Sequence, residues 1–402
     1  MTLLLCFGVL LLIAVLISGV AHRTVLSTAV LFLGAGVLLG QGFIGVVSLS
    51  EGDPIIGTLA EIALFVVLFT DGQRIGVRDL VSAWSLPGRA LLLGMPLTFV
   101  FSAIFGVVVA GLSWPESLLV AAVLAPTDPV FASAIVGREE IPGRLRHLLS
   151  VESGVNDGIA LPVVLLLLAA IGGPEVEPLD LIVELGTGVV IGIVVPAAVI
   201  ALTRIRFFSA TPLYAALTPI AIAIIVYGLS ATLDANLYLA AFSAGVTIAS
   251  LAPQLRDSFS EFGESVAEIV KLLAIFVFGA LVAPDVLADV PLGGYLFAVL
   301  LLVVARPVAV EMALLGSKLS WQERLTAGWF GPKGFASVLY GLIVLDSGAE
   351  NASQMFHLIV VAIALSILVH SSTDVPIAAY FGRDQTAKSP ARPAQTAGGP
   401  VD

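Results

Sequence analysis

Thirteen long apolar segments, separated by short polar ones, restrict this chain to a membrane fold. They span residues 2–20, 24–41, 55–70, 90–111, 117–136, 148–171, 181–202, 212–229, 236–253, 264–284, 293–316, 325–345 and 356–380. As a helix, about 20 such residues cross the hydrocarbon layer of a bilayer. The runs are continuous and lack a period of two, which excludes a transmembrane barrel. We therefore expect an all-α polytopic membrane protein with about thirteen transmembrane helices.

The composition supports one membrane domain. The chain has 402 residues, of which 58% are hydrophobic and 12% are charged, whereas soluble domains carry about 25% charged residues. We expect a single transmembrane domain over residues 1–383. Residues 384–402 are rich in Pro, Ala, Gly and Thr and predict a disordered tail. Cys6 is the single cysteine, which excludes an intrachain disulfide and a cysteine metal cluster. We expect no cofactor and no nucleic-acid partner.

The basic residues predict the orientation. Of the 18 Lys and Arg residues, Lys271, Arg306 and Lys333 lie within apolar segments. With the N-terminus placed outside, all of the others fall in inside loops or in the tail. Cytoplasmic loops carry an excess of Lys and Arg. The sequence therefore predicts a multi-pass protein of the cell (inner or plasma) membrane, with its C-terminus in the cytoplasm.

Two of the segments are interrupted near their middles. Segment 117–136 contains Ala125-Pro126-Thr127-Asp128-Pro129, and segment 325–345 contains Gly331-Pro332-Lys333-Gly334. Proline removes a backbone donor and disfavours helical geometry in the residue before it. The interrupted helices are the fifth members of two sets of six, over about 1–171 and 212–383, with 181–202 as a connector. We predict two inverted repeats whose broken helices 5 and 12 cross at the midplane, which is where transporters of this type bind their substrates.

Each break carries one charge. Half-helices that meet at the midplane present partly positive N-termini and partly negative C-termini. We expect Asp128 to neutralise the N-termini and Lys333 to neutralise the C-termini.

Segment 148–171 carries the candidate ion site. It contains Glu152, Ser153, Asn156 and Asp157, and an ionised side chain near the bilayer centre costs at least about 2.5 kcal/mol. Ser153 and Asp157 are four residues apart and share a helix face, as do Glu152 and Asn156 on an adjoining face. Hard cations prefer oxygen ligands. We expect the Asp157 carboxylate, the Ser153 hydroxyl and a backbone carbonyl at Thr127 to bind a monovalent cation.

One carboxylate that accepts either a proton or a cation is sufficient for exchange, because binding one disfavours binding the other. With Asn156 in place of a second acid, we predict electroneutral 1:1 exchange by alternating access. Asn156 is expected to tie its helix to the broken backbone by hydrogen bonds.

The remaining intramembrane charges need partners. We predict that Glu152 pairs with Arg306, and we keep Lys333 as the competing partner. Lys271 and Glu268 are three residues apart and are expected to pair with each other. Asp71-Gly72 predicts a helix end.

The chain resembles a known family in four features, namely Thr127-Asp128-Pro129, Glu152-Ser153 with Asn156-Asp157, Arg306, and the break at Gly331–Gly334. It is similar to the monovalent cation:proton antiporter-1 family, and within it to the NhaP-type sodium/proton antiporters. The resemblance covers about 380 residues.

The resemblance implies a thirteen-helix homodimer with a mobile six-helix core. It also implies cation ligation by Asp157, Ser153, the Thr127 backbone and, through water, Glu152. The exchanged ion is expected to be Na⁺ or Li⁺, with K⁺ as an alternative. Many members of the family carry arginine at the position of Lys333.

Three other functions compete with exchange. A proton-coupled transporter of a small organic solute would need aromatic or hydrogen-bonding residues around a larger cavity, and the neighbours of Asp128, Asp157 and Arg306 are small and aliphatic. A channel would need a filter repeat, which the sequence lacks. An intramembrane enzyme would need a motif such as Gly-x-Gly-Asp or His-Glu-x-x-His, and neither occurs.

Overall fold

The computed structural model describes residues 1–21, 28–74, 86–128, 140–172, 178–205 and 211–388. Within these ranges the regular structure is entirely helical, in agreement with the predicted all-α class. The second half of predicted helix 5 and the tail beyond Lys388 lie outside the described residues.

The helices follow the predicted segments in order. They are α1 (Thr2–Ala21), α2 (Thr28–Leu39), α3 (Pro54–Arg74), α5 (Leu86–Arg89), α6 (Met95–Phe105), α7 (Trp114–Leu124), α9 (Gly143–Gly172), α10 (Pro178–Thr203), α11 (Pro212–Ala215), α12 (Thr218–Thr232), α13 (Leu237–Leu251), α14 (Pro253–Leu281), α15 (Pro284–Asp289), α16 (Leu292–Leu300), α17 (Arg306–Ala313), α18 (Trp321–Trp329), α19 (Phe335–Asp346) and α20 (Ala352–Lys388). Each of the thirteen segments therefore coincides with a helix or a run of helices, and short α15 is an addition.

Six of the described helical runs are long and apolar enough to cross a membrane by themselves. These are Pro54–Arg74, Leu86–Ala110, Gly143–Ile171, Leu179–Thr203, Leu292–Ala313 and Ala352–Phe381. Helix α20 continues to Lys388, past the expected end of the membrane domain at residue 383. The helix end expected at Asp71-Gly72 is wrong, because α3 continues to Arg74 and Gly72 packs against the backbone of α13 at Gly245.

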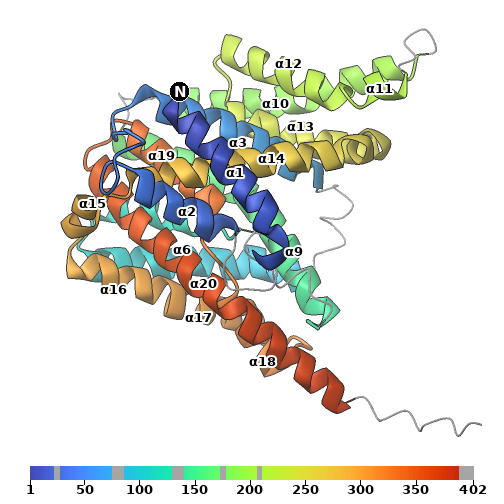
Figure 1. Ribbon diagram of the computed structural model, residues 1–402. Coiled ribbons are helices and arrows are strands. Elements are labelled where there is room, and N and C mark those ends of the chain that lie inside the picture. The colour runs from blue at the N-terminus through green and yellow to red at the C-terminus, as the bar shows by residue number, and fades with distance from the viewer. Residues whose placement is uncertain (22–27, 75–85, 129–139, 173–177, 206–210, 389–402) are drawn as a thin grey trace, which may run out of the picture.

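The helices form two groups, which we call the first and second bundles (Figure 1). The first bundle contains α1, α2, α3, α10, α12, α13 and α14, and the second contains α5–α7, α9 and α16–α20. Helix α19 lies where the two bundles meet, because it packs against α3 and α14 as well as α7 and α20.

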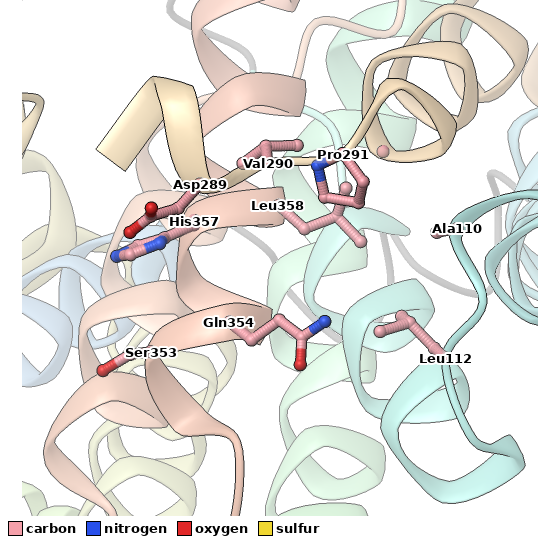
Figure 2. A pocket seen from close by; sticks show the side chains of 10 residues that line it. Ala110, Leu112, Asp289, Val290, Pro291, Ser353, Gln354, His357 and Leu358 are labelled. Carbon is pink, nitrogen blue, oxygen red and sulfur yellow. The ribbon is translucent and has the colours of Figure 1, made fainter. Parts of the chain in front are cut away.

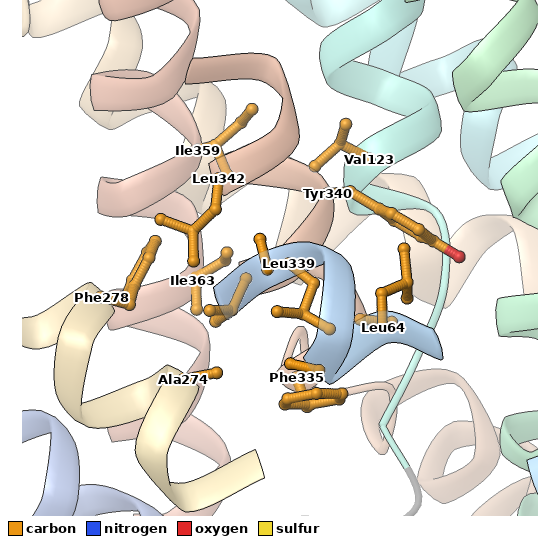
Figure 3. Close-up of a cluster of buried hydrophobic side chains, with 14 of the residues drawn as sticks. Leu64, Val123, Ala274, Phe278, Phe335, Leu339, Tyr340, Leu342, Ile359 and Ile363 are labelled. Atoms are coloured by element: carbon orange, nitrogen blue, oxygen red, sulfur yellow. The ribbon is translucent and has the colours of Figure 1, made fainter. Parts of the chain in front are cut away.

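The interior around α19 is apolar (Figure 3). Phe335, Leu339 and Leu342 of α19 are buried together with side chains from both bundles. These partners are Leu64 of α3, Ala274 and Phe278 of α14, Val123 of α7, and Ile359 and Ile363 of α20. The polar site described next is therefore enclosed by a close-packed hydrophobic interior.

Two long helical runs contain π-helical turns. Residues 86–110 include η1 (Ala90–Gly94) and η2 (Gly106–Ala110), and residues 292–313 include η3 (Leu301–Ala305). A π turn rotates the residues that follow it relative to a regular helix. Arg306 comes directly after η3, so the π turn sets the direction in which its side chain leaves the helix.

Candidate functional site

Helix α9 places the four predicted polar residues in the interior of the second bundle. Glu152, Ser153, Asn156 and Asp157 are each no more than 5% exposed. They lie near the middle of a 30-residue helix.

The broken backbone after α7 meets this face of α9. Helix α7 starts at a capping box made by Ser113 and Glu116 and ends at Leu124. Beyond it, Thr127 Oγ1 lies 3.1 Å from Ser153 Oγ and accepts a hydrogen bond of 2.6 Å from Asn156 Nδ2. Asn156 therefore ties α9 to the break, through the threonine side chain where we expected a backbone group.

Asp157 differs from Glu152 in making no ion pair with any described residue. Among the described residues nothing donates a hydrogen bond to its Oδ1, although the side chain is buried. Its backbone carbonyl accepts a hydrogen bond of 2.8 Å from the Tyr340 hydroxyl of α19. The helix position is thus fixed while the carboxylate stays available to a ligand.

Glu152 is held by the arginine that the sequence analysis assigned to it. Arg306 Nη1 lies 2.9 Å from Glu152 Oε1, and both side chains are almost completely buried. Arg306 Nη2 also donates to the carbonyl of Phe330 at 3.3 Å. The arginine therefore joins α9 to the end of α18, and Lys333 is not the partner of Glu152.

Lys333 and Asp128 lie at the crossing of the two breaks. Lys333 Nζ donates to the carbonyls of Ala125 and Pro126, both at 3.3 Å, at the end of the α7 half-helix. Asp128 Oδ2 accepts from Phe335 N–H at 2.5 Å, at the start of α19. Each charge thus faces the helix terminus of opposite sign, which is the arrangement that the sequence predicted.

The backbones of the two breaks also bond to each other, because Asp128 N–H donates to Pro332 O at 3.0 Å. Glycine is required on both sides of that contact. A Cβ at Gly331 would overlap the guanidinium of Arg306, and one at Gly334 would overlap the carboxylate of Asp128. The two glycines allow the buried charges to reach the backbone.

A hydrogen-bond chain from α20 holds the second break, and the sequence analysis did not predict it. Ser366 Oγ accepts from Lys333 N–H at 2.7 Å and lies 3.1 Å from His370 Nδ1. His370 Nε2 lies 2.9 Å from the carbonyl of Trp329, the last residue of α18. His370 Nδ1 also lies 2.7 Å from the carbonyl oxygen of Ser366, so each ring nitrogen faces a carbonyl oxygen, and a neutral imidazole donates to one of the two. His370 therefore holds both ends of the 330–334 break.

Two charged residues of the first bundle also face the site. Asp71 of α3 and Lys271 of α14 are 3% and 4% exposed, and Lys271 lies beside Phe335, whose N–H bonds to Asp128. Lys271 makes no ion pair with Glu268, so that expectation is wrong, and its Nζ lies 5.6 Å from the centre of the Phe335 ring. Lys271 lies within apolar segment 264–284 and Asp71 directly follows segment 55–70, which was the available signal. Their proximity to Asp157 depends on how the bundles dock.

A separate cavity of about 280 Å³ opens between the turns before α7 and α16 and the first turns of α20 (Figure 2). Asp289, Gln354 and His357 line it together with apolar side chains such as Leu112 and Leu358. His357 Nε2 lies 2.7 Å from Glu51 Oε1. None of the eight predicted site residues lines this cavity.

Comparison with known proteins identifies relatives along nearly the whole chain. The family model described as "Sodium/hydrogen exchanger, transmembrane" matches residues 9–380. The K(+)/H(+) antiporter NhaP2 of Shewanella sp. (strain MR-4) is 24% identical over 369 residues, which are 90% of this chain and 64% of the relative. The K(+)/H(+) antiporter NhaP of Alkalimonas amylolytica is 24% identical over 400 residues, 95% of this chain and 68% of the relative.

The fold has a solved counterpart. The structure of the sodium proton antiporter MjNhaP1 from Methanocaldococcus jannaschii at pH 8 superimposes with a TM-score of 0.76, at 19% identity, over 95% of this chain and 98% of that one. The chain spans about 64% of the length of the curated relatives named NhaP2. It thus contains the membrane fold but less than the full length of those relatives.

Proposed function

The chain belongs to the sodium/hydrogen exchanger family, and we propose that it is a secondary active antiporter that exchanges a monovalent cation for H⁺. The observation that carries the proposal is Asp157, a buried carboxylate with an oxygen that no described residue hydrogen-bonds. It lies on the helix that Asn156 and Ser153 tie to the break in the backbone. Isolated carboxylates at such a depth are usually substrate or proton sites.

The proposed cation ligands are the Asp157 carboxylate, the Ser153 hydroxyl and the Thr127 backbone carbonyl, with Glu152 acting through water. Glu152 has one oxygen on Arg306, and its Oε2 has no partner among the described residues. All of these ligands are hard oxygen donors, which suit an alkali-metal cation. Asn156, Arg306, Asp128 and Lys333 hold the surrounding backbone.

Exchange follows from competition at one carboxylate. A proton on Asp157 removes the charge that a cation needs, and a bound cation disfavours the proton. If the protein changes between its outward-open and inward-open states only when Asp157 carries a proton or a cation, one proton moves for each cation in the opposite direction. The single titratable ligand leads us to propose electroneutral 1:1 stoichiometry with alternating access.

The cation is proposed to be Na⁺ or Li⁺, with K⁺ as the second candidate. The family description and the solved structure carry sodium in their names, whereas two curated relatives are named K(+)/H(+) antiporters. We also propose a homodimer in the cell membrane, with the N-terminus outside and the C-terminus in the cytoplasm.

The experiment is a proton-flux assay on the purified protein in liposomes that contain a pH-sensitive dye. We expect Na⁺ or Li⁺, added without organic solute, to drive proton movement with saturable kinetics and an apparent KM that rises as the pH falls. Clamping the voltage with K⁺ and valinomycin should leave the rate unchanged for 1:1 exchange.

The same assay separates the rival functions. Movement that requires an added organic solute would identify a solute transporter, and flux that neither saturates nor requires counter-movement of protons would identify a channel. A response to K⁺ alone, with the voltage clamped by a K⁺-independent method, would identify the potassium exchanger.

A further inference from the structure

Two hydroxyl groups on α19 bond to the two elements that carry the proposed cation ligands. Ser337 and Tyr340 are three residues apart, so they lie on one face of the helix, and both side chains are buried. Ser337 Oγ donates to the carbonyl of Val123 in α7 at 2.8 Å. The Tyr340 hydroxyl donates to the carbonyl of Asp157 in α9, also at 2.8 Å. One face of a single helix therefore holds the end of α7 and the middle of α9.

The bond from Ser337 supplies a donor at the end of α7. Helix α7 ends at Leu124, and the last four carbonyls of a helix have no donor within that helix. Val123 provides one of these carbonyls, and Ser337 is its donor. Thr127, whose backbone carbonyl is a proposed cation ligand, follows four residues later. Ser337 thus holds the helix end from which the Thr127 carbonyl extends.

The bond from Tyr340 lies at a turn of α9 that the sequence of α9 weakens. Pro162 is inside this helix, and a proline removes the hydrogen bond to the carbonyl four residues earlier and tends to bend the helix. That carbonyl belongs to Gly158, the residue directly after Asp157. Tyr340 holds α9 at this turn. The position of Asp157 therefore depends on α19 as well as on its own helix.

The spacing between the Asp157 carboxylate and the Thr127 carbonyl controls which cation fits. Selectivity among hard cations of different size depends on the size and the flexibility of the ligand cage. The two ligands belong to different elements, which Ser153 and Asn156 join once through Thr127 Oγ1. Helix α19 joins the same elements a second time. Two connections at different points fix a relative position that one connection leaves free to pivot.

We propose that Ser337 and Tyr340 are positioning residues that set the size selectivity of the cation site. Neither hydroxyl is a cation ligand, because each is bonded to the backbone that carries one. The paired bonds keep the ligand cage at one size, so that one of Li⁺, Na⁺ and K⁺ is preferred over the others. This inference rests on the proposed exchange function and adds to it the groups that determine the preferred cation.

The test uses the full chain in liposomes and measures the apparent KM of cation-driven proton movement for Li⁺, Na⁺ and K⁺ at one pH. The readout is the selectivity ratio, which is the KM of the least favoured cation divided by the KM of the most favoured. Tyr340→Phe removes one hydroxyl and keeps the ring. The matched control is Tyr295→Phe on α16, because the Tyr295 hydroxyl donates to the carbonyl of Leu287 at the same distance of 2.8 Å.

A second pair of variants tests the other bond of α19. Ser337→Ala removes the donor to Val123. Its control is Ser265→Ala on α14, an exposed serine whose hydroxyl donates to the carbonyl of Glu261 in its own helix. Melting temperatures are measured on the same preparations.

In the wild type and in both controls we expect one cation to be clearly preferred, with the same selectivity ratio. In Tyr340→Phe we expect the ratio to fall at least about twofold, which is within the contribution of one hydrogen bond. Ser337→Ala should lower the ratio in the same direction. A residue that only stabilises the fold would lower the rate and the melting temperature while the three KM values keep their proportions.

Two outcomes overturn the inference while leaving the exchange function intact. One is a folded Tyr340→Phe protein with the wild-type selectivity ratio, and Ser337→Ala decides in the same way if the tyrosine variant does not insert. The other is a wild-type protein with equal KM values for the three cations, because it has no selectivity to set. A wild-type protein that moves no protons in response to Li⁺, Na⁺ or K⁺ overturns the proposed function and this inference with it.

Discussion

Two carboxylates on the same helix, Glu152 and Asp157, are equally buried but have different surroundings. Glu152 is paired at 2.9 Å with Arg306, a cation that cannot lose its proton. Asp157 has no such ion-pair partner among the described residues, and its Oδ1 receives no hydrogen bond from them. The first acid is neutralised by an arginine of the same bundle and serves the structure. The second has no ion-pair partner among the described residues, so its carboxylate can bind and release a cation or a proton.

The largest expected effect is the loss of transport when the charge of Asp157 is removed. Asp157→Asn should reduce cation-driven proton movement to the level of protein-free liposomes, because an amide does not titrate near neutral pH and lacks the negative charge for which a proton and a cation compete. The melting temperature should change little, since the Tyr340 hydrogen bond is to the backbone of residue 157. The matched control is Asp234→Asn at an exposed turn with φ 49°, a conformation that asparagine tolerates. Exchange that survives Asp157→Asn would refute the site.

Removing the partner of Glu152 should lower stability, whereas Asp157→Asn should abolish transport and leave stability nearly unchanged. Arg306→Ala leaves Glu152 buried and unpaired, which costs about 3–5 kcal/mol of stability. We expect a large loss of melting temperature in detergent and poor recovery of folded protein. Adding Glu152→Gln should restore much of the stability, because the uncompensated charge is then gone. Equal melting temperatures for Arg306→Ala and Asp157→Asn would contradict the distinction between the two acids.

The glycine beside the paired charge gives a smaller effect. Gly331→Ala forces a Cβ into the guanidinium of Arg306, and overpacking of this kind costs about 1–3 kcal/mol. Gly228→Ala on α12 is the control, since a Cβ there meets no atom within 4 Å. We expect thermal unfolding to show a loss for residue 331 and no loss for residue 228. Two similar curves would mean that Arg306 moves aside without cost.

The smallest expected effect comes from removing the hydrogen bond between Ser366 and the backbone of the 330–334 break. Ser366→Ala leaves the N–H of Lys333 without its acceptor, at a cost of about 1–3 kcal/mol. Ser372→Ala, on the same helix, removes a hydroxyl that donates to the carbonyl of Leu368 in its own helix. The first variant should have a raised KM for the cation, because Lys333 orders the carbonyls next to Thr127, and the second should not. Equal apparent KM values for the cation in the two variants would show that Ser366 does not influence cation binding through Lys333.

Most of the fold was predictable because the bilayer imposes a simple rule on each segment separately. Apolar length predicts a helix, and all thirteen predicted segments coincide with helices or runs of helices in the described part of the chain. Gly-Pro pairs predict a break, and α18 and α19 are separated at residues 330–334. The Glu152–Arg306 contact was also predictable, because an intramembrane acid needs a cation and few are available.

The surroundings of the site were harder to predict. His370 and Ser366 bond to a break that lies more than thirty residues earlier in the sequence. Lys271 was expected to pair with its neighbour Glu268, and the structure instead places it over Phe335. Local spacing could not predict these contacts, because each depends on how one helix rotates and docks against another.

The sequence by itself determined the membrane class, the order of the helical segments in the described part of the chain and the break at residues 330–334. These properties follow from the local cost of placing polar groups in hydrocarbon. Only the tertiary structure decided which buried charges are satisfied and which remain open. That outcome depends on packing between helices that are distant in the chain, and it makes Glu152 a structural acid and leaves Asp157 open to a ligand.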